Sequence, residues 1–213
     1  MITQLGLIDY GMGNLHSVQR AFLRLGQTLK IVKKPTDIDK CNALVLPGVG
    51  SFDPAMDHLK QTKLIPHIIN WANEDRPLLG ICLGLQLLFE SSDEGTSKGL
   101  GILKGNIEHL PENQNERIPN MGWSLLKSQS DCPIFKNHHL NNWVYFVHSY
   151  AAIPSERKNL AATIKFGSHE ITAIVWEKNI GACQFHPEKS GTAGQMMLDR
   201  WLKWLVNNDK LKE

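Results

Sequence analysis

Alternating strand-like and helix-like segments in the first half of the chain place the strongest limit on its fold. Residues 5–9, 29–32 and 43–46 are short apolar runs, and Pro47-Gly48 ends the last of them. A helix is predicted over residues 14–25, with Asn14 as a suitable N-cap. Apolar residues recur there at helical spacing: Leu15, Val18, Phe22 and Leu25. Such alternation predicts a parallel sheet covered by helices on both faces.

The second half of the chain is richer in strands, with few helices between them. The predicted strands cover residues 106–110, 123–126, 143–150, 160–166, 171–176 and 181–185. Because the connections are short, some of these strands are expected to be antiparallel. A last helix is predicted to begin near Gly191, where Met197, Trp201, Trp204 and Leu205 form one apolar stripe. No internal repeat or low-complexity linker divides the chain, so a single domain over residues 1–213 is predicted.

Composition narrows the functional class. Of the 213 residues 42% are hydrophobic and 21% are charged, and a net charge of +2 with scattered lysines argues against a nucleic-acid footprint. The most apolar stretch, residues 77–89, is interrupted by Gln86 and is shorter than the ~18 apolar residues of a membrane span. Residues 1–14 do not resemble a signal peptide, so secretion is not expected.

The four cysteines are widely separated and form no C-x-x-C pair. This pattern argues against a zinc knuckle or a redox dithiol and favours reduced thiols in the cytoplasm. No histidine belongs to an H-E-x-x-H motif. We therefore expect neither a metal nor a cofactor.

Residues 77–89 have the shape of a nucleophile elbow, in which an apolar strand runs into G-x-C-x-G and then an apolar helix. Gly80 and Gly84 permit a sharp turn and close packing. Cys82 is expected at the tip, with its sulfur exposed at the helix N-terminus, where the helix dipole favours the thiolate. A buried structural cysteine explains this segment equally well when it is taken alone.

Residues 181–188 form a strand that leads to His186-Pro187-Glu188. Pro187 biases His186 toward an extended backbone. The spacing lets the carboxylate of Glu188 reach one imidazole nitrogen and fix the tautomer, which leaves the other nitrogen free to accept a thiol proton. A lone H-P-E is more often a capped loop, so neither motif is decisive by itself.

In combination, a cysteine elbow followed about a hundred residues later by strand-H-P-E resembles the class I glutamine amidotransferases. The resemblance extends over nearly the whole chain. The segments that carry it are residues 9–14 (DYGMGN), 46–50 (LPGVG), 80–86 (GICLGLQ), 119–123 (PNMGW), 146–150 (FVHSY) and 185–191 (FHPEKSG). It implies a flavodoxin-like three-layer α/β/α fold, with a central mostly parallel sheet and additional antiparallel strands in the C-terminal half.

The resemblance also assigns the chemistry of glutamine hydrolysis. It makes Cys82 the nucleophile, His186 the general base and later acid, and Glu188 the group that orients His186. A glutamyl thioester forms, ammonia leaves, and water releases glutamate. The N–H groups of Leu83 and Val49 would stabilise the oxyanion.

The remaining assignments concern the substrate and a partner. Gln86, one helical turn beyond Cys82, and Glu94 are expected to hold the amino-acid end of glutamine, with backbone contacts from Ser149 and Tyr150; Gly50 completes the predicted substrate contacts. Trp123 and Lys189 are expected to face the synthase that uses the ammonia. Asn120 stands where the family pattern has a histidine.

The chain has no residues to spare for an acceptor-binding domain if the glutaminase fold occupies all of it. The resemblance then implies a heterodimer with a separate cyclase subunit of (β/α)8-barrel fold. A paralogue that supplies another synthase is the nearest alternative, and a γ-glutamyl hydrolase or cysteine peptidase could use the same triad. Gly11-Met12-Gly13 does not complete G-x-G-x-x-G, because His16 occupies the third glycine position.

Overall fold

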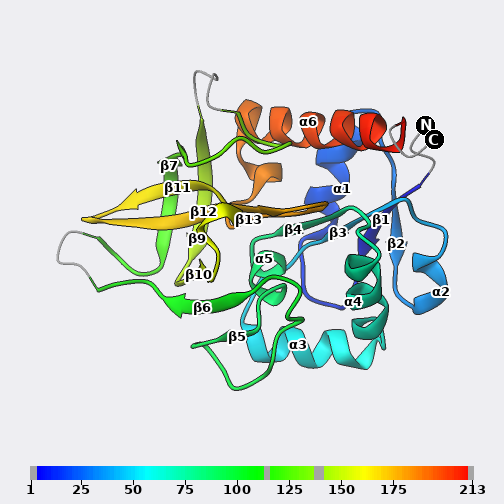
Figure 1. Ribbon diagram of the computed structural model, residues 1–213, viewed down its shortest axis with the longest axis horizontal. Helices are drawn as coiled ribbons and strands as arrows, with labels where there is room; N and C mark the ends of the chain where they lie inside the picture. Colours follow the sequence, from blue (N-terminus) through cyan, green and yellow to red (C-terminus); the bar gives the residue numbers. More distant parts are fainter. Residues whose placement is uncertain (1–3, 113–115, 137–141, 211–213) are drawn as a thin grey trace.

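The computed structural model describes residues 4–112, 116–136 and 142–210. Its centre is an eight-stranded sheet in the order β2-β1-β3-β4-β13-β12-β11-β8 (Figure 1). The strands are β1 (Leu5–Ile8), β2 (Leu29–Val32), β3 (Ala43–Leu46), β4 (Leu78–Ile81), β8 (Lys127–Ser128), β11 (Leu160–Phe166), β12 (His169–Glu177) and β13 (Ile180–Cys183). The five strands from β2 to β13 are parallel to one another, whereas β12 pairs antiparallel with β13, and β11 pairs antiparallel with both β12 and β8.

Helices cover both faces of this sheet, as the alternation predicts (Figure 1). On one face lie α1 (Leu15–Leu23) and α6 (Gly191–Lys210), and on the other lie α3 (Phe52–Gln61), α4 (Ile65–Asn73) and the short α5 (Leu83–Leu87). Helix α2 (Pro35–Ile38) follows β2 at the sheet edge. Two buried apolar clusters separate the layers: Phe22 and Trp201 belong to the α1/α6 side, and Phe52 and Trp71 to the opposite side.

Two smaller sheets extend the molecule beyond the antiparallel end. One contains β5 (Ser91–Ser92), β6 (Gly105–His109) and β10 (Tyr150–Pro154), and the other is a ribbon of β7 (Asn120–Leu125) and β9 (Trp143–His148). Ser149 is the single residue between β9 and β10, so it joins the ribbon to the three-stranded sheet. Short 3₁₀ turns at Arg157–Asn159 (η1) and Pro187–Lys189 (η2) complete the fold.

The predicted mixed sheet is confirmed, and several predicted elements match closely. The strands at 29–32, 43–46 and 160–166 have the predicted bounds, α6 begins at Gly191, and the Asn14 side chain accepts a hydrogen bond from Ser17 N at 3.1 Å as the N-cap of α1. The prediction over 143–150 is wrong in continuity, because the chain turns at Ser149. Helices α3 and α4 were not predicted, and the helix after Cys82 ends at Leu87 rather than near Phe89.

None of the helices in the described part of the chain has the length and apolar character required to cross a bilayer.

Candidate active site

The sheet order brings together segments that are far apart in sequence. β4 lies between β3 and β13, and all three are parallel, so their carboxyl ends share one edge of the sheet. The loop of residues 47–50 follows β3, Cys82 follows β4, and His186 lies three residues beyond β13. Crevices at the carboxyl ends of parallel strands are the usual ligand sites of doubly wound sheets.

Cys82 has the backbone of a sharp strand-to-helix turn. Its φ of 55° and ψ of −113° are unfavourable for a residue with a Cβ, and such strain costs about 1–3 kcal/mol. The backbone N–H of Cys82 donates to Cys183 O at 2.8 Å, which ties the turn to β13. The elbow geometry therefore agrees with the G-x-C-x-G prediction.

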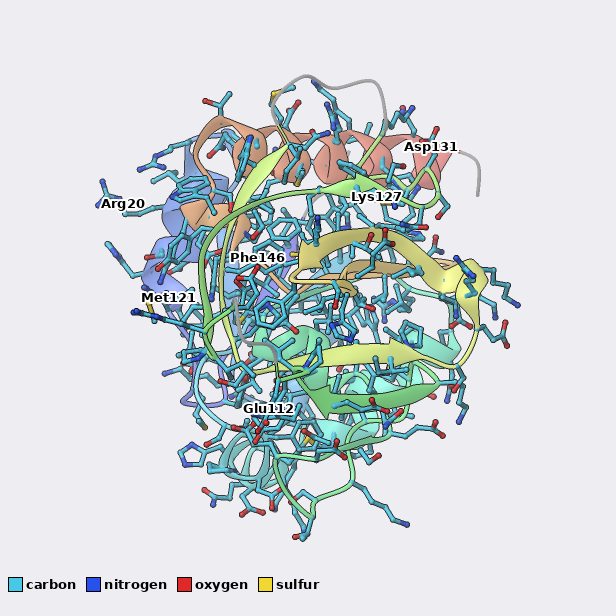
Figure 2. All side chains as sticks on the ribbon, turned by 90° about the vertical axis from the view of Figure 1, so that its left-hand side faces the viewer. Arg20, Glu112, Met121, Lys127, Asp131 and Phe146 are labelled. Atoms are coloured by element: carbon cyan, nitrogen blue, oxygen red, sulfur yellow. The ribbon has the colours of Figure 1, made fainter. Side chains whose placement is uncertain are left out.

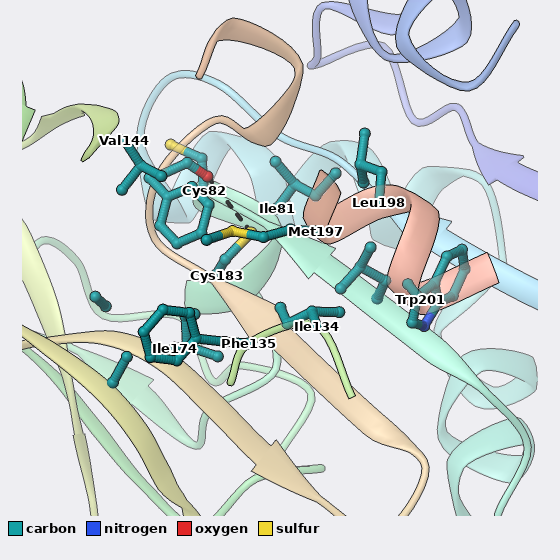
Figure 3. Packing of buried hydrophobic residues seen from close by; sticks show 14 of the residues in the cluster. Ile81, Cys82, Ile134, Phe135, Val144, Ile174, Cys183, Met197, Leu198 and Trp201 are labelled. Carbon is teal, nitrogen blue, oxygen red and sulfur yellow. Dashed lines mark hydrogen bonds between the residues drawn. The ribbon is translucent and has the colours of Figure 1, made fainter. Parts of the chain in front are cut away.

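The expectation that the sulfur is exposed is wrong, because Cys82 is only 7% exposed. In Figure 3 it lies at the margin of the apolar cluster, near Val144, Ile81 and Cys183. Val147 of β9 lines the same cavity as Cys82, so the β7–β9 ribbon helps to enclose the elbow. The sequence of the elbow itself does not indicate that a distant strand covers it. Cys82 accordingly faces a cavity rather than open solvent.

Glycine allows the elbow and the 47–50 loop to approach each other closely. A Cβ on Gly84 would lie 1.9 Å from Leu46 O, and a Cβ on Gly48 would lie 2.4 Å from Tyr10 Oη and 2.9 Å from Leu83 Cβ. Gly50 adopts φ 103°, which a residue with a side chain rarely adopts. The close contacts at Gly48 and the positive φ of Gly50 thus explain why glycine stands on both sides of Val49.

His186 and Glu188 form a buried pair. Nδ1 of His186 lies 2.8 Å from Glu188 Oε1, and both side chains are almost fully buried. His186 has the extended backbone that Pro187 favours. The position of His186 is fixed further because its carbonyl oxygen accepts from Ser190 Oγ at 2.6 Å.

The electrostatic surroundings favour a protonated His186. Burial alone lowers its pKa, but the neighbouring Cys82 and the hydrogen-bonded carboxylate of Glu188 outweigh burial and raise the pKa to about 10. Among the described residues, Nε2 has no hydrogen-bond partner of normal geometry. Because Nδ1 is committed to Glu188, Nε2 is the nitrogen available to exchange a proton with Cys82 or a substrate.

A cavity of about 290 Å³ joins these groups to the predicted substrate contacts. Its walls are formed by Val49, Gly50, Cys82, Leu83, Gln86, Glu94, Pro119, Val147, His148, Ser149, Tyr150 and His186. Its volume is near the lower end of ligand pockets, which suits a molecule the size of an amino acid. Glu188 does not line the cavity; it contacts His186 from behind.

Gln86 is oriented by two acceptors. Its Nε2 donates to Tyr150 O and to Gln184 Oε1, each at 3.2 Å, so its two amide hydrogens are engaged. The Gln86 carbonyl oxygen is therefore the atom left to accept from a ligand, such as an ammonium group. Tyr150 O also accepts from His148 Nδ1 at 2.8 Å.

Glu94 is a half-buried wall of the cavity and not a solvated loop carboxylate. Its Oε2 accepts from the backbone N–H of Phe52 at 2.8 Å, at the first residue of α3. An acidic group in this position also interacts favourably with the helix dipole. The cavity wall is thereby attached to α3.

His148 is a buried neutral histidine beside the site. Burial is the main cause that lowers its pKa to about 4; the hydrogen bond to the Tyr150 carbonyl raises the pKa by less, and the charge of His186 lowers it by a still smaller amount. Nδ1 carries the proton that is donated to Tyr150 O, so Nε2 accepts from Asn120 Nδ2 at 3.0 Å. Asn120, the departure from the family pattern, thus has a defined structural partner.

Trp123 and Lys189 lie outside the cavity. Along β7 the side chains of Met121, Trp123 and Leu125 share one exposed face; Met121 is 63% exposed and Trp123 is 52% exposed. Figure 2 shows Met121 at the edge of the molecule and Phe146 inside it. Across the ribbon, Trp123 packs against Tyr145 with a ring separation of 5.9 Å, and Leu125 pairs with the exposed Trp143.

Sequence reasoning assigned no role to three residues of the site: Tyr10, His148 and Gln184. Tyr10 Oη donates to Pro47 O at 2.9 Å beneath the 47–50 loop, and burial raises the pKa of Tyr10. The sequence feature that could have identified Gln184 is its polar amide side chain within an otherwise apolar predicted strand. Within the described residues, no group of three or more His, Cys, Asp or Glu side chains is placed to hold a metal ion.

Known proteins of one family resemble nearly the whole chain. The model of the family "Glutamine amidotransferase class-I" matches residues 6–204. "Imidazole glycerol phosphate synthase subunit HisH" of Prochlorococcus marinus strain MIT 9211 is 63% identical over 205 residues, covering 96% of each chain. The protein of the same name from Prochlorococcus marinus strain SARG is 59% identical and covers 99% of each chain.

Two solved structures show the same fold at low sequence identity. A putative GMP synthase subunit from Thermoplasma acidophilum has a TM-score of 0.72 and 19% identity, covering 100% of this chain and 98% of that one. A chain of PurLQS from Thermotoga maritima has a TM-score of 0.74 and 20% identity, with coverage of 96% and 100%.

Proposed function

The chain belongs to the class I glutamine amidotransferases, and from this premise we propose that it is the glutaminase subunit of an imidazole glycerol phosphate synthase. It hydrolyses glutamine to glutamate and ammonia, and the ammonia is used to make imidazole glycerol phosphate and an aminoimidazole carboxamide ribotide in histidine biosynthesis. The observation that carries the proposal is the strained, cavity-facing Cys82 beside the buried His186–Glu188 pair.

The residues divide the reaction between them. The Cys82 thiolate attacks the side-chain amide carbon of glutamine, and the C–N bond breaks as His186 transfers its proton to the departing ammonia. The raised pKa of His186 favours the protonated form that this step needs. Water then attacks the thioester with His186 as base, which releases glutamate and restores the thiolate. Glu188 keeps the imidazole in the required tautomer.

The cavity walls supply oxyanion and substrate contacts. Leu83 and Val49 line the cavity beside Cys82, and their N–H groups are the proposed donors to the oxyanion. The free carbonyl oxygen of Gln86 is the proposed acceptor for the substrate ammonium, with Glu94 supplying a negative charge on the same wall. Gly50, Ser149 and Tyr150 are the proposed backbone contacts.

The partner is proposed to be a cyclase subunit of (β/α)8-barrel fold that docks on the exposed face of the β7–β9 ribbon. Support comes from the apolar side chains on that face, since aromatic anchors dominate protein interfaces. Lys189 is exposed one residue beyond Glu188, so a partner seated there would adjoin the site. We place this heterodimer in the cytoplasm, where the four free cysteines would remain reduced. The family match over residues 6–204 supports one glutaminase domain.

The chemistry is tested by offering the purified chain L-glutamine and a γ-glutamyl peptide, each with Cys82→Ser as the comparison. We expect glutamate release from free glutamine and its loss in Cys82→Ser, because a serine hydroxyl is a far weaker nucleophile than a thiolate. Preferential cleavage of the peptide would make the protein a γ-glutamyl hydrolase instead.

The partner is tested by measuring turnover of the chain alone, with the cyclase, and with the cyclase plus its nucleotide ligand. We propose that the Val49 N–H turns toward the oxyanion only when the cyclase carries its ligand. Turnover should then rise by roughly 10²- to 10³-fold in the last case, which is the size of one oxyanion donor. Trp123→Ala should weaken cyclase affinity by about tenfold or more, whereas Leu23→Ala, an exposed apolar change on α1, should not. Equal turnover in all three mixtures would contradict the coupling.

A further inference from the structure

Gln184 is the most completely buried polar side chain near the nucleophile. It follows β13, lies two residues before His186, and has an exposed fraction of 0%. Its backbone N–H donates to Ala173 O at 2.9 Å, which leaves the side-chain amide to find separate partners. A buried amide without hydrogen bonds is strongly unfavourable, so its two contacts define its role.

Those contacts join Gln184 to both Gln86 and Cys82. Gln184 Oε1 accepts from Gln86 Nε2 at 3.2 Å, and Gln184 Nε2 lies 3.9 Å from Cys82 Sγ as a donor to the large sulfur atom. The donor and acceptor roles in this series of hydrogen bonds are set by Tyr150. The Tyr150 carbonyl can only accept, so Gln86 must direct its NH₂ group toward it.

The same NH₂ group of Gln86 reaches Gln184, which therefore presents oxygen to Gln86 and nitrogen to Cys82. Swapping the oxygen and nitrogen of Gln184 would set two NH₂ groups against each other. It would also direct an oxygen lone pair at a thiolate. The orientation of Gln184 is thus determined by Tyr150 through Gln86.

We propose that Gln184 is a positioning residue for the glutaminase reaction, whose side-chain N–H group donates a hydrogen bond to the Cys82 sulfur and stabilises the thiolate. The sulfur is negative before attack and again after the thioester breaks, and a charged acceptor makes a hydrogen bond stronger. In the thioester the sulfur carries no charge, so the contact favours the two thiolate states over the intermediate. The catalytic role of Gln184 depends on the proposed glutaminase function. Its stabilisation of the Cys82 thiolate does not depend on that function.

The test is the pH dependence of Cys82 alkylation by iodoacetamide, with the modified peptide identified by mass spectrometry. Only the thiolate reacts, so the midpoint of the rate profile reports the thiol-to-thiolate change. The ionisable groups around the sulfur are His186, Glu188, Tyr10, Cys183, His148 and Glu94. None of them is altered in the variants below.

Gln184→Met has similar length and no donor, and it should move the alkylation midpoint upward by about one pH unit. This shift corresponds to an about tenfold change in the thiol–thiolate equilibrium, which is the size of one hydrogen bond to a charged group. Glutamine turnover near neutral pH should fall by a similar factor and recover as pH rises, whereas KM should rise at every pH because Gln86 Nε2 loses one of its two acceptors. Thr172→Val, which also replaces a buried polar side chain but on β12, is the matched control and should keep the wild-type midpoint.

Gln184→Leu provides the second arm if the methionine variant does not fold. Leucine adds no charge beside the sulfur and cannot donate to it, so the midpoint should again move upward. A wild-type midpoint in a folded Gln184 variant overturns the proposal, even if turnover falls. Alkylation needs no glutamine, so this result is interpretable even if the wild-type chain proves not to be a glutaminase.

Discussion

Acidification from about pH 7.5 to about pH 5.0 should remove the stability that His148 contributes, because His148 is buried in its neutral form. Burial lowers the pKa of His148 from its ordinary 6.5 to about 4. Between these two values the unfolded chain binds a proton that the folded chain does not, so the free energy of unfolding falls as pH falls. The stabilisation is fully present above pH 6.5. Protonation of Nε2 would also remove the acceptor of the Asn120 hydrogen bond.

The size of the effect follows from the two pKa values. The full difference corresponds to about 3.4 kcal/mol at 1.36 kcal/mol per pH unit, and at about pH 5.0 about 2 kcal/mol of it has been lost. His186 acts in the opposite direction, because its raised pKa gives a contribution that is complete below pH 6.5 and falls as pH rises from 6.5 to about 10. This change is common to the wild type and to a His148 variant, so it cancels when the two are compared. Carboxylates with lowered pKa values, such as Asp53 and Glu90, change the stability only at more acidic pH.

The assay is urea unfolding followed by the fluorescence of the six tryptophans, repeated at intervals across this pH range. The wild-type chain should lose about 2 kcal/mol more between about pH 7.5 and pH 5.0 than His148→Gln, which cannot titrate. His67→Gln, an exposed change on α4, should behave like the wild type. If His148→Gln loses as much stability as the wild type, the assignment of a buried neutral His148 is wrong.

Three further predictions follow from the geometry of the site. Gly84→Ala should destabilise the fold by roughly 3 kcal/mol or more in urea unfolding, because its Cβ would lie 1.9 Å from Leu46 O; a smaller loss would mean that the elbow can shift. Cys82→Gly should be more stable than Cys82→Ala by about 1 kcal/mol in the same assay, since glycine relieves the strained φ of 55°; the opposite order would contradict stored strain. His186→Ala should lower steady-state turnover on the order of 10²-fold. Glu188→Gln should lower turnover less, but its activity should fall at a lower alkaline pH than that of the wild type, because the carboxylate helps to raise the pKa of His186. An unchanged alkaline limb of the pH profile would refute that role of Glu188.

Local patterns predicted the parallel half of the sheet because its signals are short-range. The apolar runs 29–32 and 43–46 are bounded by turn residues, and Asn14 precedes the helical stripe of α1. Helix α3 carries a comparable buried stripe at Phe52, Ala55, Met56 and Leu59. Prolines lie within the first turns of α3 and α4, a position that proline tolerates although it often marks a break.

The motifs around Cys82 and His186 contain the proposed catalytic residues, and their order along the chain is enough to recognise the family. Their side chains meet only because β13 pairs with β4, about a hundred residues earlier in the chain. Neither segment specifies that pairing by itself, because parallel strands are joined through long connections and selected by packing of the whole sheet.

The sequence alone therefore determined most of the strands, helices α1 and α6, and the family, which depend on local spacing and residue type. Only the tertiary structure decided that Cys82 is enclosed, that His148 is neutral against Asn120, and that Gln184 donates to the sulfur. Burial and hydrogen-bond direction depend on neighbours that arrive from other elements. Such contacts are visible only in the structure, because a local sequence segment does not specify which distant group will bury a side chain or form a hydrogen bond with it.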